Sequence, residues 1–385
     1  MPIGHLAAEL RLVEVSDRRT LDRFIALPNQ LYRSHAAYVA PLTLERRDAL
    51  SEKKNPYFRH ARARFWLACR GERPVGRISA QIDELSLQRH GATLGHFGML
   101  DAEDDPAVFA LLTGAAESWL KSQGMDRVRG PFNLSINEEC GLLIDGFDSR
   151  SVMMMGYAPP YAGHRIEEQG YAKAKDLIAY DYVVADTRTI DRNGRLRKVL
   201  SDGRVRARKL DMKRYRHDLS LILEVFNDAW SENWGFIPFT EEEIQHAAAS
   251  MKPLIQPELV WVAEVDGKVA GMIVCLPNLN EAIAGLDGAL LPFGWLKLLW
   301  RLKVRGVRSG RVALFGVCKR FHRTPLGGAL ALLLLQALRE NASRIGYTHA
   351  ELSWILEDNK AVSQVIESVG GRPYKTYRIY EKALT

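Results

Sequence analysis

The sequence predicts an α/β protein made of two similar domains. Two observations lead to this prediction: both halves share one order of strands and helices, and a polar, basic stretch at 185–203 separates them. The length of 385 residues is ample for two domains with separate cores. We therefore expect one domain at 1–184, a linker at 185–203 and a second domain at 204–385.

The first half alternates strands and helices. Alternating apolar and polar residues indicate strands, and apolar residues at every third or fourth position indicate helices. A turn at 71–74 joins two strands within 62–83 as a hairpin, and Pro106 and Gly124 mark the ends of a helix. The other predicted strands are 9–16, 93–100, 126–132 and 173–184, and the other predicted helices are 20–34, 43–52 and 160–169.

The second half repeats this order. Its hairpin is predicted at 259–277, with the turn at Asp266 and Gly267. Its other strands are predicted at 204–210, 311–318, 348–356 and 373–381, and its helices at 214–230, 240–250, 325–343 and 359–369. The pattern therefore indicates an internal duplication of architecture.

Composition excludes several classes of protein. Apolar residues make up 47% of the chain and charged residues 26%, which is typical of a folded globular protein. The four cysteines lie far apart, so we expect no bound metal and a reduced, cytoplasmic chain. We see no signal peptide and no apolar run near the roughly 18 residues of a spanning helix, which leaves attachment to a membrane surface open. The net charge of +7 permits an anionic partner without demanding one.

A turn with two glycines follows the predicted strand 311–318. Gly327 and Gly328 lie where this strand leads into an apolar helix. Glycines at such a turn let backbone N–H groups point at a pyrophosphate, and the start of the helix adds partial positive charge. Three cations stand beside the turn: Lys319, Arg320 and Arg323. The segment therefore predicts a site for a nucleotide-linked ligand, although glycine-containing turns also occur in α/β proteins without one.

This strand, turn and helix resemble the acyl-CoA loop of the GNAT (GCN5-related N-acetyltransferase) family, which usually reads Gln/Arg-x-x-Gly-x-Gly/Ala. Thr324 stands where Gln or Arg is usual. The resemblance implies two tandem GNAT-like domains, each a mixed, mostly antiparallel sheet flanked by helices, and acyl-CoA as a substrate with no metal. The residues expected to bind acyl-CoA are Val317, Cys318, Lys319, Arg320, Arg323, Thr324, Gly327, Gly328, Ala329 and Asn359.

The end of the strand 311–318 carries the predicted oxyanion site. Backbone N–H groups near Val317 and Cys318 would hold the thioester oxygen and stabilise the tetrahedral intermediate. The Cys318 thiol also suggests an acyl-cysteine, but the family transfers its acyl group directly, so direct transfer is the favoured interpretation.

The C-terminal stretch carries a second match to the family. Asn359 opens the helix after the fifth strand, as in the family, but Ile366 replaces the tyrosine that often serves as general acid seven residues later. Tyr377 or Tyr380 would then protonate the leaving thiolate. Otherwise the thiolate leaves unassisted, since its pKa resembles the value of about 8.5 for free cysteine.

The corresponding turn of the first half is acidic and has no glycine. Four carboxylates stand where a diphosphate would lie, and they would repel it: Asp101, Glu103, Asp104 and Asp105. We therefore expect the N-terminal domain to be degenerate for CoA and to shape the acceptor site.

A polar segment at 130–143 supplies the acceptor candidates. Asn133, Ser135 and Asn137 alternate, so they would line one face and orient a polar head group. Glu138 or Glu139 would take a proton from an ammonium group. The other interpretation is a solvated loop held by Asx turns. The predicted catalytic residues are thus Asn137, Glu138, Glu139 and Tyr377.

Apolar contacts to the substrate are predicted from two segments. The methionine-rich stretch 153–161 contains Tyr157 and Tyr161, although core packing explains the same residues. Trp295 lies in the second segment, 290–311, and is also counted among the candidate substrate contacts.

The segment 290–311 lies in a strongly basic part of the chain. From 288 to 339 there are ten basic residues and no acidic one. A helix over 293–305 would place Lys297, Arg301 and Arg305 on one face and leucines and Trp295 on the other. This composition predicts a helix on an anionic membrane surface, with an ordinary helix packed on the sheet as the alternative. No RNA-reading motif is present, so we expect no nucleic acid partner.

The overall layout resembles the bacterial ceramide synthases. The matching stretches are GPFN-S-N-E in the first domain and ILEDNK…GG…KTYRIYEK at the end. The resemblance implies an N-acyltransferase that moves an acyl group from acyl-CoA to an amphiphilic amine, a long-chain sphingoid base, to give (dihydro)ceramide. Two alternatives stay open: a tandem-GNAT transferase that uses aminoacyl-tRNA, and a catalytically silent module that senses acyl-CoA or lipid.

Overall fold

The computed structural model describes residues 9–185, 194, 201 and 203–384. The chain forms two compact units. The first consists of 1–176, 283–294 and 376–385, and the second of 177–282 and 295–375. This division differs from the predicted domains in two ways: each unit includes a strand segment from the other half of the chain, and 283–294 belongs to the first unit. Most of the predicted linker lies outside the described residues.

The sheet of the first unit is mostly antiparallel. Its strand order is β1-β2-β3-β4-β5-β13, and β6 pairs with β13. Only β4 and β5 run parallel, with Leu94 opposite Arg127. The strands are β1 (Leu10–Glu14), β2 (Ala61–Arg70), β3 (Arg73–Asp83), β4 (Leu94–Ala102), β5 (Arg127–Gly130), β6 (Leu142–Asp145) and the 376–383 part of β13 (Arg372–Ala383).

The four predicted helices of the first unit are present with bounds shifted by a few residues, and a short helix at Glu84–His90 was not predicted. Pro106 occupies the first turn of α4, and the carboxylate of Asp105 caps this helix by accepting from the Ala107 N–H group. Apolar residues of α1 such as Phe24 and Leu27 are fully buried in the core. The helices are α1 (Arg18–Tyr32), α2 (Thr43–Ala49), the 3₁₀ turn η1 (Pro56–Arg59), α3 (Glu84–His90), α4 (Pro106–Ser122) and α5 (Tyr161–Glu167).

The sheet of the second unit repeats that of the first. Its order is β8-β9-β10-β11-β12-β7, and again only one pair, β11 with β12, is parallel. The strands are β8 (Val205–Lys209), β9 (Val260–Val265), β10 (Lys268–Pro277), β11 (Ser309–Val317), β12 (His349–Leu356) and the 177–183 part of β7 (Ala172–Val183). The sixth strand of each sheet is thus supplied by the other half of the chain, a feature that no local sequence pattern indicates.

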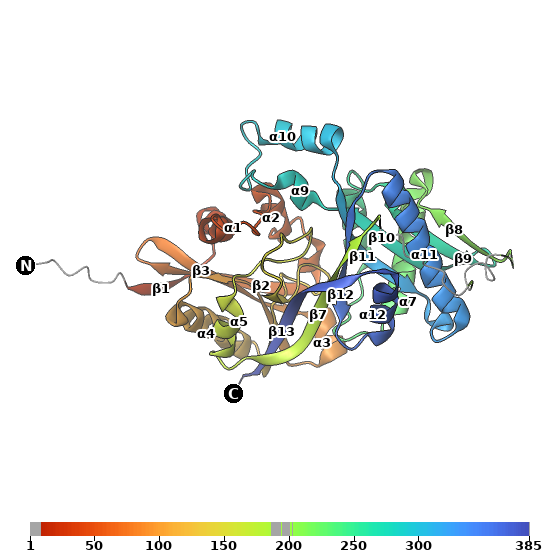
Figure 1. The fold of residues 1–385 in the computed structure, drawn as a ribbon. Helices are drawn as coiled ribbons and strands as arrows, with labels where there is room; N and C mark the ends of the chain where they lie inside the picture. The colour runs from red at the N-terminus through yellow and green to blue at the C-terminus, as the bar shows by residue number, and fades with distance from the viewer. Residues whose placement is uncertain (1–8, 186–193, 195–200, 202, 385) are drawn as a thin grey trace, which may run out of the picture. The chain divides into compact units, whose positions relative to one another are not determined.

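The helices of the second unit include the long α11, which packs on β9 and β10 (Figure 1). Its leucines Leu330 and Leu334 are fully buried in the core. The α-helices are α7 (Tyr215–Trp230), α8 (Glu241–Met251), α9 (Leu279–Ile283), α10 (Gly294–Trp300), α11 (Pro325–Arg344) and α12 (Lys360–Val369). The short turns are η2 (Met212–Arg214), η3 (Pro257–Leu259), the π-helical η4 (Arg301–Arg305) and η5 (Lys319–Phe321). The predicted fold class, with its repeated order of elements, is confirmed.

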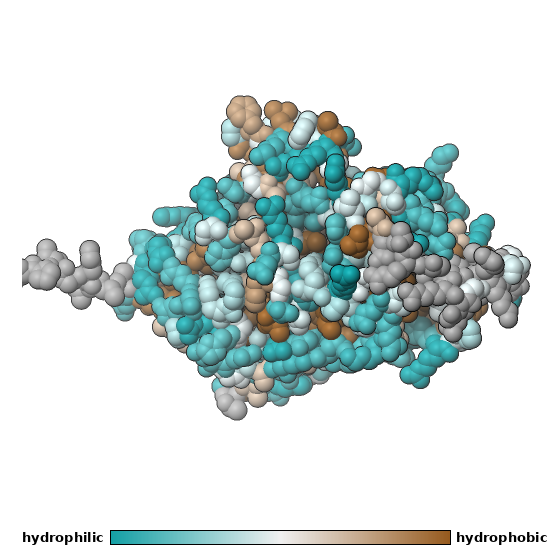
Figure 2. Space-filling model, in the orientation of Figure 1, coloured by the Kyte–Doolittle hydropathy of each residue, from teal (hydrophilic) through white to brown (hydrophobic). Residues whose placement is uncertain are grey.

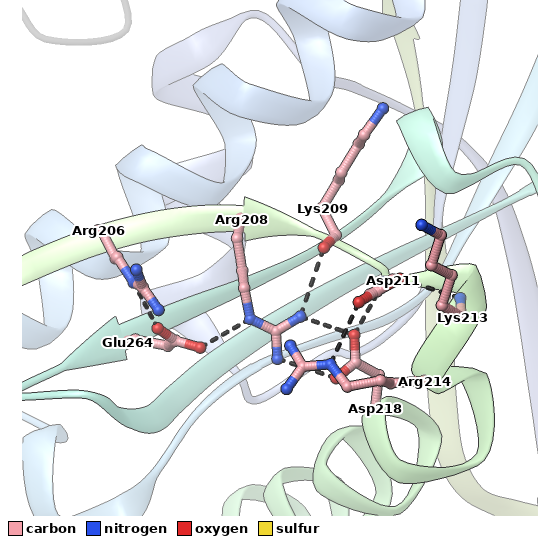
Figure 3. Close-up of polar contacts among 8 residues, drawn as sticks. All are labelled: Arg206, Arg208, Lys209, Asp211, Lys213, Arg214, Asp218 and Glu264. Atoms are coloured by element: carbon pink, nitrogen blue, oxygen red, sulfur yellow. Dashed lines mark hydrogen bonds and ion pairs between the residues drawn. The ribbon is translucent and has the colours of Figure 1, made fainter.

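An ion-pair network fixes the edge strand β8 to α7 and β9 (Figure 3). Arg208 donates two hydrogen bonds to the Asp218 carboxylate, at 2.6 and 2.9 Å, and one to Glu264 at 2.7 Å. Arg206 holds the other oxygen of Glu264 at 2.6 Å. Burial raises the pKa of Asp218, but bonds from Arg208 and from the Asp211 N–H group outweigh burial and leave that pKa below its usual value. Because Asp218 is fully buried, its charge depends on Arg208.

Candidate active site

The parallel strands β11 and β12 separate part-way along their length. They pair only from Ser309 opposite His349 to Val312 opposite Leu352, although β11 continues to Val317 and β12 to Leu356. Beyond Val312 and Leu352 the ladder of backbone hydrogen bonds between the two strands ends. The sheet of the second unit therefore opens into a split.

A cleft follows this split. Its walls come from both strands and from the ends of α7 and α12. Trp230 of α7 donates a 3.3 Å hydrogen bond from Nε1 to the Phe315 carbonyl group, and its ring lies 6.0 Å from that of Trp354. Asn359 caps α12 by accepting from the Val362 N–H group, so this predicted residue lies at the cleft. Aromatic walls and exposed strand backbone suit a narrow, chain-like ligand.

A buried polar cluster lies at the point where the strands separate. Ser353, which lines the cleft, accepts a 2.9 Å hydrogen bond from Nε of Arg311 and donates its hydroxyl proton to Glu351. The Tyr374 hydroxyl group donates to the other oxygen of Glu351. Arg311, Glu351 and Ser353 are each 4% exposed. Charged groups this deeply buried need hydrogen-bonding partners. Here the Ser353 hydroxyl group connects the buried carboxylate of Glu351 to the cleft.

Lys375 completes the cluster. It is 1% exposed, and burial lowers the pKa of its ammonium group to about 8, with the nearby negative charge of Glu351 opposing the shift. A lysine with this pKa is mostly charged at neutral pH but gives up its proton more readily than an exposed lysine. Groups with shifted pKa values gather at functional sites.

The sequence analysis missed all five members of the cluster. The signal available was polar residues within otherwise apolar strands: Arg311, Glu351, Ser353, Tyr374 and Lys375.

The glycine-bearing turn before α11 has the predicted form. Thr324 caps the helix, its Oγ1 accepting from the Gly327 N–H group at 3.0 Å. A Cβ atom on Gly327 would lie 2.1 Å from the Phe321 carbonyl oxygen, whereas one on Gly328 would meet open space. Arg320 and Arg323 are exposed beside the turn. The turn therefore presents a helix start, a neutral cap and two cations, while Ala329 is buried behind it.

Other predicted residues of this turn are engaged within the protein. The Cys318 N–H group donates to the Ala270 carbonyl oxygen at 2.8 Å, and so is not available to a thioester oxygen. Lys319 donates from its backbone to Asp228 and from its side chain to Glu232. Burial, followed by the charge of Asp228, raises the pKa of the Cys318 thiol. A raised thiol pKa opposes nucleophilic attack by cysteine.

The corresponding split in the first unit is filled. Beyond its short pairing with β5, β4 bonds instead to the segment after β5: the Phe132 N–H group donates to the Phe97 carbonyl oxygen, and the Met99 N–H group donates to Asn133 Oδ1, both at 2.8 Å. A Cβ atom on Gly98 would lie 1.8 Å from the Phe132 carbonyl oxygen. The chain itself thus occupies the position that is a cleft in the second unit.

The acidic turn of the first unit is neutralised, which corrects the predicted cause of its behaviour. Each carboxylate is paired with its own arginine: Asp101 with Arg77, Glu103 with Arg73, Asp104 with Arg165 and Asp105 with Arg70. Simple repulsion by four unpaired charges is therefore the wrong reason. The structural difference from the second unit is that Asp105 itself occupies the anion position at the start of α4.

The polar segment of the first unit is an ordered loop. Asn133 donates from Nδ2 to Glu139 at 2.9 Å, and Ser135 accepts from the Asn137 N–H group at 3.2 Å. Gln81, which is fully buried, donates to the Phe132 carbonyl group at 2.6 Å. Glu138 is exposed, and Glu139 lies 3.6 Å from Arg46. Turns hold the loop, Glu138 remains exposed, and Glu139 is half-buried and accepts a hydrogen bond from Asn133.

The predicted aromatic contacts have structural roles. The Tyr157 hydroxyl group lies 2.6 Å from His35 Nδ1, and Tyr161 donates to the Ala102 carbonyl group at 2.7 Å. Tyr377 is fully buried, opposite Leu143 of β6 in the first unit. Trp295, by contrast, is 47% exposed on α10.

Comparisons with known proteins place this geometry in a family. The chain is 51% identical over 385 residues to the bacterial ceramide synthase of Caulobacter vibrioides, and the match covers 100% of both chains. The chain belongs to the bacterial ceramide synthase family. It is also 44% identical over 370 residues to Protein YghO of Escherichia coli, covering 96% of this chain and 94% of that one. No family model matches the chain.

Solved structures support the fold of this ceramide synthase family member. A tandem GNAT protein from the clavulanic acid biosynthesis pathway matches with a TM-score of 0.57 at 12% identity, covering 98% of this chain and 99% of that chain. A GCN5-related N-acetyltransferase from Sphaerobacter thermophilus matches with a TM-score of 0.54 at 13% identity, covering 97% and 96%. The predicted tandem GNAT fold is therefore confirmed, and the protein is an N-acyltransferase.

Proposed function

We propose that this protein transfers an acyl group from acyl-CoA to the amino group of a long-chain sphingoid base, forming a (dihydro)ceramide. The observation that carries the proposal is the contrast between the two units: the second has an open split beside a glycine-bearing helix start, and the first has its split filled. Full-length identity of 51% to a protein named for ceramide synthesis supports the acceptor class.

In this proposal acyl-CoA binds the second unit. Its pyrophosphate lies at the start of α11, where Arg320 and Arg323 supply positive charge and the Gly328 position leaves room for close approach. The pantetheine chain follows the split between β11 and β12, beside Asn359. The thioester then lies near Ser353, where the strands separate.

The chemistry at that point is a substitution at the thioester carbonyl carbon. The neutral amine nitrogen forms a C–N bond, the C–S bond of the thioester breaks, and the nitrogen gives up one proton. Ser353 can accept this proton while its own hydroxyl proton moves to Glu351, because the two side chains are hydrogen-bonded. The CoA thiolate leaves and takes up a proton from the medium, as befits a leaving group with a pKa of about 8.5.

The acceptor half of the reaction is less constrained. Glu138 and Glu139 stay predicted proton acceptors, with Asn133, Ser135 and Asn137 ordering their loop. Tyr377 stays a predicted acid, although its full burial in the first unit does not favour this role. Glu351 is the carboxylate that the open cleft of the second unit favours.

An amphiphilic acceptor resides in or near lipid, so the proposal includes peripheral association with a membrane. No helix in the described ranges combines the length and apolarity that crossing a bilayer demands.

The test is a product assay. Purified protein is incubated with palmitoyl-CoA and sphinganine or 3-ketosphinganine, free thiol is followed by its reaction with a chromogenic disulfide, and the lipid extract is analysed by mass spectrometry. We expect equimolar thiol and N-acyl product. Acyl-CoA binding without thiol release across a panel of amines would identify a sensor instead. Product formed only from aminoacyl-tRNA would identify the other transferase class.

A further inference from the structure

One helical segment, which lies in the second unit from Trp295 onward, has no buried side. Residues 291–305, called here the apolar segment, comprise α10, η4 and the three residues before them. Neither α10 nor η4 contains a buried residue. Figure 2 shows hydrophobic side chains gathered over α10. The exposed large apolar residues of the segment are Leu291, Phe293, Trp295, Leu296, Leu299, Trp300 and Val304.

This exposure excludes the ordinary interpretation of the segment. A helix packed on a sheet would bury its leucines and tryptophans, yet Trp300 is 54% exposed and Val304 is 70% exposed. Elsewhere in the described ranges, exposed large apolar side chains are scattered singly. A contiguous apolar surface of this kind marks a place where the protein meets another apolar phase.

Charge identifies that phase. Lys297, Lys303 and Arg305 are exposed along the same segment, Arg308 follows it, and no acidic residue occurs from 288 to 339. Arg301 instead donates to the Ala282 carbonyl group at 2.7 Å and ties the segment to its own unit. A second copy of the chain would bring the same positive charge to this surface and be repelled. The partner must therefore offer an apolar interior for the exposed tryptophans and leucines and a negatively charged surface for the lysines and arginines.

We propose that the apolar segment docks on a lipid bilayer that carries anionic phospholipid. Trp295 and Trp300 lie at the level of the head groups, the leucines enter the acyl boundary, and the lysines and arginines contact lipid phosphates. This inference deepens the proposed function, because it brings the enzyme to the phase that holds an amphiphilic acceptor. Its test measures binding, so it can fail while the acyltransferase activity stands.

The experiment is flotation of the full-length protein with vesicles. One set contains phosphatidylcholine alone, and the other contains about 30% phosphatidylglycerol. We expect the partition coefficient to be at least about tenfold higher on anionic vesicles, and to fall severalfold between 0.1 and 1 M salt because salt screens surface charges. Equal binding to both vesicle types, or binding to neither, would overturn the proposal.

Matched variants localise the effect. Leu299→Ser with Trp300→Ser removes apolar contact, and Lys297→Glu with Arg305→Glu inverts charge; each pair should lower the partition coefficient about tenfold or more. The controls carry changes of the same kind at exposed positions elsewhere: the single change Leu44→Ser, and Lys53→Glu with Lys268→Glu. Circular dichroism and activity on detergent-dispersed substrates check that each variant is folded.

Two other possible partners of the apolar segment would give different experimental results. A dimer in light scattering that Leu299→Ser with Trp300→Ser dissociates, without vesicle binding, would show that the segment joins two copies. Retention on an immobilised acidic carrier protein, again without vesicle binding, would assign the segment to a protein partner. Either result would contradict the bilayer proposal.

Discussion

The Nε atom of Arg311 donates a 2.9 Å hydrogen bond to Oγ of Ser353, and this contact lies where β11 and β12 part. Arg311 is the last-but-one residue of β11 that pairs with β12, and Ser353 is the first residue of β12 beyond the pairing. The bond therefore holds the hydroxyl group in place at the closed end of the cleft. Because that hydroxyl group in turn donates to Glu351, the cluster gives the cleft a path for one proton.

The first prediction concerns this path. Glu351→Gln removes the proton acceptor, and we expect kcat for thiol release to fall about a hundredfold or more, the usual range for loss of a general base, with a smaller change in KM. Ser353→Ala should lower kcat by at least about tenfold.

Rates of thiol release, measured at saturating acyl-CoA over a range of amine concentrations, give these values of kcat and KM. Glu340→Gln on the exposed side of α11 is the matched control and should leave kcat unchanged. If Glu351→Gln keeps its activity while folding normally, the base lies elsewhere, and Glu138→Gln and Glu139→Gln become the variants to examine.

The second prediction concerns CoA binding at the start of α11. Arg320→Gln with Arg323→Gln removes two exposed cations, and we expect Kd for CoA to rise about fivefold, since each such contact contributes about 0.5 kcal/mol at a surface. Gly328→Asp adds a carboxylate in the open position and should weaken binding more strongly. Titration calorimetry measures Kd, with Gly328→Ala as the control that keeps the charge. Unaltered affinity both in Arg320→Gln with Arg323→Gln and in Gly328→Asp would place the nucleotide at another site.

A third prediction addresses the pH dependence of stability through Lys375. Its pKa of about 8 in the folded protein lies below the usual value of 10.5 for lysine, so between these values the unfolded chain binds more protons and stability rises with pH. Below about pH 8 both states are protonated, and the full penalty of the buried charge, about 3 kcal/mol, is present.

Lys375→Met removes that penalty. The difference in free energy of unfolding between Lys375→Met and the native protein should therefore shrink as pH rises from 8 to 10.5. Urea unfolding at several pH values measures it, and comparison of the two proteins cancels the titrating groups that do not interact with Lys375. A difference that stays constant over this window would show that Lys375 does not titrate there.

The fourth prediction concerns the ion-pair network at β8. Asp218→Asn leaves Arg208 with a weakened partner in a buried setting, and we expect the second unit to lose about 3 kcal/mol of stability. Arg206→Ala, whose side chain is 70% exposed, should change stability by less than about 1 kcal/mol. Thermal unfolding compares the pair, and equal effects would contradict the role assigned to burial.

A fifth prediction tests the filled split of the first unit. Gly98→Ala places a Cβ atom 1.8 Å from the Phe132 carbonyl oxygen, so the segment after β5 must shift and the protein should be destabilised by several kcal/mol. Gly114→Ala in α4 meets open space and should stabilise by up to about 1 kcal/mol, since alanine favours helices. Calorimetric unfolding curves distinguish the two, and a stable Gly98→Ala protein would show that the close approach is not required.

By itself, the sequence determined the order of strands and helices, the duplication and the glycine-bearing turn. These features depend on neighbouring residues: alternation between 62 and 83 makes a hairpin, and Pro106 with its Asp105 cap begins a helix whatever the rest of the chain does. The basic, apolar character of 291–305 is likewise a local property. The resemblance of the whole chain to its family likewise depends on short stretches of consecutive residues.

Only the tertiary structure decided where those elements end up. The first half of the chain supplies β7 to the second sheet, and the second half supplies β13 to the first sheet. This exchange depends on pairings between residues far apart in the chain, such as Tyr380 with Gly130. The cluster at Ser353 forms because side chains from β11, β12 and β13 meet, and its polar members have no pattern of their own in the sequence. The acidic turn of the first unit likewise owes its neutrality to four arginines that folding brings to it.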